Sequence, residues 1–108
     1  MPYYYEPIWH ENSTDKEEEI ASLYSSKEEP KHIDSIILIG WNNEGILAIY
    51  REREKLGEIP TGASNIQLPA EIPIDLDLPE GQTFRLTLKN RVTGTNAKLI
   101  GYIKYQLK

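Results

Sequence analysis

Residues 83–89 (TFRLTLK) alternate apolar with polar side chains, and residues 98–108 (KLIGYIKYQLK) follow a turn-forming segment at residues 93–96. Because successive side chains of an extended chain point to opposite faces, a period of two puts every second residue on the same side. The apolar residues that share one side of the first segment are Phe84, Leu86 and Leu88. The two segments therefore predict a β-hairpin with one face in a hydrophobic core.

The second of these segments is apolar on both sides. Its core-facing residues are predicted to be Leu99, Ile103, Tyr105 and Leu107. Ile100 and Tyr102 then point to the opposite side, where solvent is expected. A second apolar side usually indicates a binding partner. We therefore expect Ile100 and Tyr102 to contact another molecule.

The middle of the chain also has the pattern of strands. Residues 35–41 contain four consecutive aliphatic side chains, which is typical of a strand that is central or covered on both sides. Residues 46–50 are expected to return antiparallel after a turn and to continue through residues 51–54. Residues 72–78 alternate but include Pro73, which favours a sheet edge. About six or seven short strands with regular turn signals predict an all-β fold, a small antiparallel β-sandwich over residues 35–108.

Residues 1–34 differ from the rest in charge and pattern. They hold nine of the 17 acidic residues but only three of the 12 basic ones. The aromatic residues near the start lie between prolines, which predicts an extended arm. Residues 14–17 (TDKE) match a capping box, and Ile20, Leu23 and Tyr24 follow at helical spacing. We therefore expect an acidic N-terminal segment, an arm followed by one short helix at about residues 15–26, ahead of the sandwich.

Composition excludes several classes of function. The 108 residues are enough for one domain, and the absence of cysteine excludes disulfides and thiolate-based metal or catalytic sites. The net charge of −5 argues against nucleic acid as a partner. No long apolar run predicts a membrane span, and the first residues do not resemble a secretion signal. We expect a soluble protein that is made in the cytoplasm.

No residue pattern indicates catalysis or metal binding. His10 and His32 lack the spacing of metal ligands, and no nucleophile elbow is present. Asp75 and Asp77 share one side of a strand, with Glu71 further along it, but this arises in any alternating strand. We predict no catalytic residue, no metal site, no cofactor and no enzymatic activity.

Aromatic residues are the most informative candidates. Exposed rings could stack on sugars, and the platform candidates are Trp9, Trp41 and Tyr102. The other explanation is burial in the core or between subunits, where tyrosine and tryptophan are also enriched. For a homo-oligomer interface the candidates are Tyr3, Tyr4, Tyr5, Trp9, Ile100 and Tyr102. A third possibility is that the acidic helix binds a basic partner.

Residues 78–90 (LPEGQTFRLTLKN) and 97–105 (AKLIGYIKY) resemble small jelly-roll domains of bacteriophage and archaeal-virus structural proteins. In those domains a Leu-Pro-x-Gly turn precedes an alternating strand that ends in Asn, and a Gly-Tyr-Ile-x-Tyr strand returns. The resemblance covers about the last thirty residues. It implies a non-enzymatic assembly or decoration module of a virion, often trimeric, that contacts itself and other particle proteins. The alternative hypothesis is a carbohydrate-binding β-sandwich.

Overall fold

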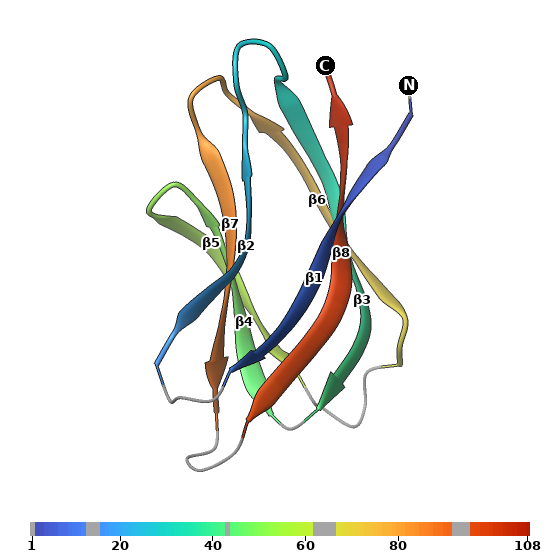
Figure 1. The fold of residues 1–108 in the computed structure, drawn as a ribbon, viewed down its shortest axis with the longest axis vertical. Coiled ribbons are helices and arrows are strands. Elements are labelled where there is room, and N and C mark those ends of the chain that lie inside the picture. Colours follow the sequence, from blue (N-terminus) through green and yellow to red (C-terminus); the bar gives the residue numbers. More distant parts are fainter. Residues whose placement is uncertain (1, 13–15, 43, 62–66, 92–95) are drawn as a thin grey trace.

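The chain forms two antiparallel β-sheets of four strands each, packed face to face (Figure 1). The computed structural model describes residues 2–12, 16–42, 44–61, 67–91 and 96–108. The strands are β1 (Tyr4–Asn12), β2 (Glu18–Tyr24), β3 (Lys31–Asn42), β4 (Gly45–Arg51), β5 (Glu54–Thr61), β6 (Ala70–Leu78), β7 (Thr83–Asn90) and β8 (Ala97–Leu107). The predicted all-β antiparallel sandwich is confirmed.

The strand order shows how the chain folds over itself. One sheet, called here the β1 sheet, has the order β1-β8-β3-β6, and the other, the β2 sheet, has the order β2-β7-β4-β5. β4 pairs with β5, β3 with β6, β2 with β7 and β1 with β8, always antiparallel. The pairs are nested, so that one long hairpin has wrapped into two sheets. This is the arrangement of a jelly roll.

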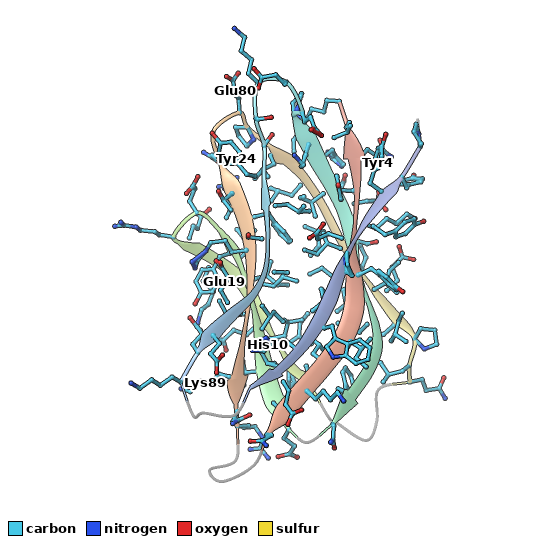
Figure 2. The ribbon with its side chains drawn as sticks, in the orientation of Figure 1. Tyr4, His10, Glu19, Tyr24, Glu80 and Lys89 are labelled. Atoms are coloured by element: carbon cyan, nitrogen blue, oxygen red, sulfur yellow. The ribbon has the colours of Figure 1, made fainter. Side chains whose placement is uncertain are left out.

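The core lies between the two sheets and is almost entirely aliphatic (Figure 2). Its fully buried side chains are Ile8, Ile33, Ile36, Leu38, Leu47, Leu78, Phe84, Leu86, Leu88, Leu99 and Ile103. They come from both sheets and alternate with outward residues along each strand, as face-to-face packing requires. Phe84, Leu86, Leu88, Leu99 and Ile103 occupy the inward positions that their alternation predicted, and Tyr105 packs against the same core.

The predicted hairpin of the last two strands is wrong. β7 belongs to the β2 sheet and β8 to the β1 sheet, so their apolar sides face each other across the core. The expected return of residues 46–50 is wrong for the same reason, since β3 and β4 lie in different sheets. The predicted continuation through residues 51–54 is instead the turn of the β4–β5 hairpin, in which Glu52 has a φ of 56°.

The predicted helix at residues 15–26 is also wrong, and the described part of the chain contains no helix. Residues 18–24 form β2, which has a bulge between Glu19 and Ala21 where it pairs with β7. The bulge lets both Ile20 and Ala21 pack against the core, which imitates helical spacing. Tyr24, the third residue of the helical pattern, points to solvent.

Residues 1–34 do not form a separate segment. β1 is paired with β8 along its whole length, and its Ile8 is 1% exposed in the core. The expected boundary at residue 34 falls inside β3. The acidic N-terminal region therefore supplies two strands and the start of a third to the sandwich.

Some expectations fall on residues outside the described ranges. These are the cap at Thr14 and Asp15 and most of the turn at residues 93–96. No helix long and apolar enough to cross a membrane occurs in the described ranges.

Candidate functional site

The outward side of the β1 sheet carries most of the exposed aromatic rings. Tyr5 and Trp9 alternate with inward residues along β1, and Trp9 is 73% exposed. Tyr3 continues the same row just before β1, where its ring lies 4.2 Å from Lys104 Nζ. Tyr102 of β8 is 38% exposed and lies directly opposite Pro7 of β1, between Tyr5 and Trp9. We call this surface the aromatic face.

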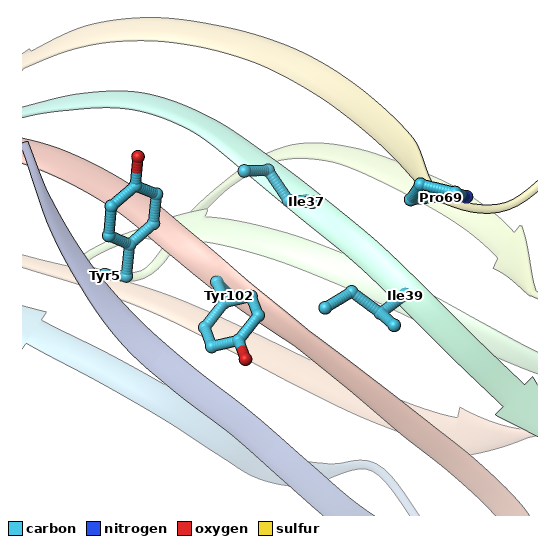
Figure 3. A pocket seen from close by; sticks show the side chains of 5 residues that line it. All are labelled: Tyr5, Ile37, Ile39, Pro69 and Tyr102. Carbon is cyan, nitrogen blue, oxygen red and sulfur yellow. The ribbon is translucent and has the colours of Figure 1, made fainter.

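A shallow hollow of about 620 Å³ opens on the aromatic face (Figure 3). It is lined by Tyr5, Ile37, Ile39, Pro69 and Tyr102. The rings of Tyr5 and Tyr102 meet edge to face with their centroids 6.2 Å apart, a favourable aromatic geometry. Ile37 lies directly opposite Tyr102 in the β3–β8 register, and Figure 3 shows the side chain of Ile39 directed towards Tyr102.

The four consecutive aliphatic residues of β3 explain why one side of the hollow is apolar. Ile36 and Leu38 point inward and are fully buried, whereas Ile37 and Ile39 point outward. β3 is central in its sheet, as predicted, but the described chain covers it on one side only. An apolar strand surface of this kind is typical of a binding site.

Charged residues frame the aromatic face without giving it a strong net charge. Lys104 Nζ lies 3.6 Å from Asp34 Oδ2 and 3.9 Å from Glu71 Oε2. Desolvation acts to lower the pKa of Lys104, but the carboxylates of Glu71 and Asp34 outweigh it and raise the pKa above its usual value. Ser35 Oγ donates a hydrogen bond to Glu71 Oε2 at 2.7 Å and holds that carboxylate in place.

The other end of the row has a second lysine. Lys98 Nζ lies 5.5 Å from the centroid of the Trp9 ring, within the range of a cation–π contact. Lys98 is also directly opposite Glu11 in the β1–β8 register. A cross-strand pair of opposite charges is favourable and balances the charge at this end.

The outward side of the β2 sheet has a different character. Tyr50 there is covered by charged groups, with the Arg85 guanidinium 4.8 Å from its ring centroid. Its hydroxyl donates to the carboxylate of Glu17, at 3.1 and 3.2 Å from the two oxygens. The ring and the hydroxyl of Tyr50 are therefore already in contact with charged side chains of the same protein. The aromatic face is therefore the better candidate for binding another molecule.

The two aspartates of β6 contact His32 and Lys108. A bulge opposite residues 33–35 places Asp75, with a φ of 48°, beside Asp77 at the sheet edge. His32 Nε2 lies 2.9 Å from Asp75 Oδ1, and His32 Nδ1 lies 3.0 Å from Asp77 Oδ1. Lys108 Nζ also contacts Asp77, at 2.6 Å. Among the described residues, no three His, Asp or Glu side chains converge as metal ligands.

Not all of the predicted site residues share the aromatic face. Tyr4 points to the other side of β1 and stacks on Tyr105, with centroids 5.7 Å apart. Trp41 is half-buried against the core, opposite the buried Leu99. Ile100 lies outward beside Trp9 and is half-buried.

The sequence-based site lacked Ile37, Ile39 and Pro69, which line the hollow. The signal that could have found the isoleucines is the unbroken aliphatic run of β3. That run fits a strand that is central in its sheet as well as one that is covered on both sides, so it does not by itself indicate an exposed apolar side.

Comparisons with known proteins give a fold but no family. No protein-family model matches the chain, and no curated protein matches it. Its structure is similar to the crystal structure of the CBM36-1 domain of a multidomain xylanase from the hindgut metagenome of Trinervitermes trinervoides, with a TM-score of 0.55. The match covers 95% of this chain and 97% of that chain at 13% sequence identity. A likeness at this identity establishes the shared fold, and function has to be argued from the site.

Proposed function

We propose that the protein is a non-catalytic carbohydrate-binding domain that holds a glycan on the aromatic face. The observation that carries this proposal is the group of exposed rings on a single sheet, namely Tyr3, Tyr5, Trp9 and Tyr102. Aromatic rings offer flat apolar surfaces on which the C–H side of a sugar ring can stack, while tyrosine hydroxyls remain able to hydrogen-bond.

The surroundings of these rings fit a sugar ligand. The hollow has a volume within the usual range for small-molecule sites, about 300–1,000 Å³. Lys104, directly opposite the lining residue Tyr5, and Glu71, directly opposite the lining residue Ile37, supply a hydrogen-bond donor and an acceptor for sugar hydroxyls. The fold likeness to a carbohydrate-binding domain of a xylanase supports the same function, although jelly rolls also serve in viral capsids.

Affinity electrophoresis through gels that contain soluble xylan, β-glucan, mannan or pectin tests this function. Retardation of the wild-type protein by at least one polysaccharide is expected. Tyr102→Ala should abolish the retardation, because Tyr102 is central to the face. Tyr24→Ala is the matched control, since Tyr24 is 55% exposed but belongs to the β2 sheet. A wild-type protein that no polysaccharide retards would refute the proposal.

The apolar lining of the hollow favours one second candidate, a self-associating structural module in which the aromatic face packs on another subunit. Exposed apolar surface of this kind is usual at subunit interfaces. Light scattering at high micromolar concentration distinguishes the two functions. An oligomer that Ile100→Asp dissociates would support the second candidate, and a strict monomer would eliminate it.

A further inference from the structure

The rings of the aromatic face form a row instead of a cluster. Tyr3 lies just before β1, Tyr5 and Trp9 lie within it, and all three point outward, whereas Tyr102 fills the gap between Tyr5 and Trp9, opposite Pro7. From Tyr3 to Trp9 the row spans six residue steps, which is about 20 Å in an extended strand. This length is several times the width of one sugar ring. A monosaccharide or a chain end would use only part of it.

The row is not flat. Strands in a sheet twist with a fixed hand, so successive outward side chains are rotated relative to one another. Figure 1 shows β1 running at an angle across β8, so the surface of the sheet that carries the row is twisted. A single polysaccharide chain can follow such a surface, whereas the flat face of a crystalline polymer cannot contact all the rings at once.

Local charges around the row are balanced. Lys104 is paired with Asp34 and Glu71, and Lys98 is opposite Glu11. Among the described residues around the row, no surplus of positive charge is left to attract a polyanion, so a polymer of uronic acids has no electrostatic advantage here.

We infer that the row binds a neutral, extended segment within a linear polysaccharide, with several sugar rings in contact at once. This inference rests on the proposed carbohydrate-binding function and adds the ligand class. It assigns the ends of the binding row to Tyr3 and Trp9 and its centre to Tyr5 and Tyr102.

Isothermal titration calorimetry with xylo-oligosaccharides and cello-oligosaccharides, from disaccharide to hexasaccharide, tests the inference. These probes have equatorial linkages that expose the C–H sides of successive rings along the chain. Affinity should rise about tenfold for each further aromatic contact that a longer oligosaccharide reaches. Polygalacturonate and microcrystalline cellulose should bind more weakly than the soluble neutral chains.

Variants at the two ends of the row give the sharper test. Trp9→Ala and Tyr3→Ala should each lower hexasaccharide affinity about tenfold and lower disaccharide affinity by a smaller factor, because a short ligand can still bind elsewhere along the row. Both side chains are exposed, and an unchanged melting temperature verifies the fold of each variant. Trp9→Leu, which keeps apolar bulk but removes the ring, should behave as Trp9→Ala does. Tyr24→Ala should match the wild type with every ligand.

The possible failures are distinguishable. Binding of no glycan at all would overturn the proposed function together with the inference. Binding in which a disaccharide is held as tightly as a hexasaccharide would overturn the inference alone. So would a preference for polygalacturonate, or end variants that bind the hexasaccharide normally.

Discussion

Gly101→Ala should strongly destabilise the protein, because the backbone of β3 leaves no room for a Cβ atom at Gly101 of β8. A Cβ atom at this position would lie 2.3 Å from the carbonyl oxygen of Ile37 and 3.3 Å from the Cα of Leu38. Both atoms belong to the backbone next to the bulge between Leu38 and Gly40, so no side chain can rotate away. The contact must lengthen by about 1 Å to reach ordinary van der Waals distance.

The expected cost can be built from two contributions. Overpacking a close contact costs about 1–3 kcal/mol, and each ladder hydrogen bond weakened by separating β8 from β3 adds about 1 kcal/mol. The free energy of unfolding should therefore fall by about 3 kcal/mol. With a denaturant slope of about 1.5 kcal/mol per molar urea, the unfolding midpoint should fall by about 2 M.

Urea unfolding followed by tryptophan fluorescence measures this shift, and Gly40→Ala is the control. A Cβ at Gly40 would have no heavy atom within 4 Å, so alanine there should leave the midpoint unchanged or raise it slightly. If Gly101→Ala unfolds within about 0.5 kcal/mol of the wild type, the argument from close β3–β8 contact is refuted.

Three further predictions concern stability. Ile8→Ala should lower the free energy of unfolding by about 2–4 kcal/mol in urea titrations, since the Ile8 side chain is buried in the core. A loss below about 0.5 kcal/mol would mean that β1 is an arm that can detach from the sandwich. The hydrogen bond to Asp77, with a further contribution from Asp75, raises the pKa of His32 above its ordinary value of 6.5. Protonated His32 therefore stabilises the folded state below pH 6.5, and this stabilisation is lost as the pH rises through the folded-state pKa. His32→Gln should therefore lower the urea midpoint at about pH 5.5 more than at about pH 8.5, and equal losses at both would contradict the paired geometry. Thr87→Val should raise the free energy of unfolding by up to about 1 kcal/mol, because the buried Thr87 hydroxyl has no hydrogen-bond partner in the described chain. Thermal unfolding measures the change, and a clear loss of stability would show that the hydroxyl does have a hydrogen-bond partner.

Alternation along single strands was enough to predict the sandwich and its inward residues. It fixes which side of a strand is buried but does not say which strand lies beside it. β7 and β8 follow each other in sequence and both alternate, so they were predicted to pair. In the structure they lie in different sheets, and packed sheets are generally about 10 Å apart, so the two strands face each other without pairing.

The errors near the start of the chain have a local cause. Ile20 and Leu23 both face the core because the bulge in β2 shifts the strand period by one residue, and Tyr24 completes the helical spacing although it points to solvent. A capping-box sequence in front of them strengthened the wrong interpretation. Tertiary pairing with β7 outweighs these local preferences, which are worth about 1 kcal/mol each.

Part of the candidate site was predictable and part was not. Ile100 and Tyr102 were expected outward from the period of β8, and they lie outward. The contribution of β3 could not be derived, because an apolar run fits a strand covered on both sides as well as one covered on a single side. Trp41 could not be assigned to a side until the β3–β8 register was known.

The nested pairing also sets an order in which the molecule can assemble. β4 and β5 are joined by a tight turn and can pair as soon as both have been synthesised, whereas β1 must wait for β8, about a hundred residues later. Long-range pairing of this kind is slow to form, and because β8 is the last strand in the sequence, its pairing with β1 is the last of the nested pairings that a growing chain can complete. Tyr5 and Tyr102 come together only in that step, so a nascent or partly folded chain has no assembled binding row. Ligand affinity therefore reports completion of folding as well as function.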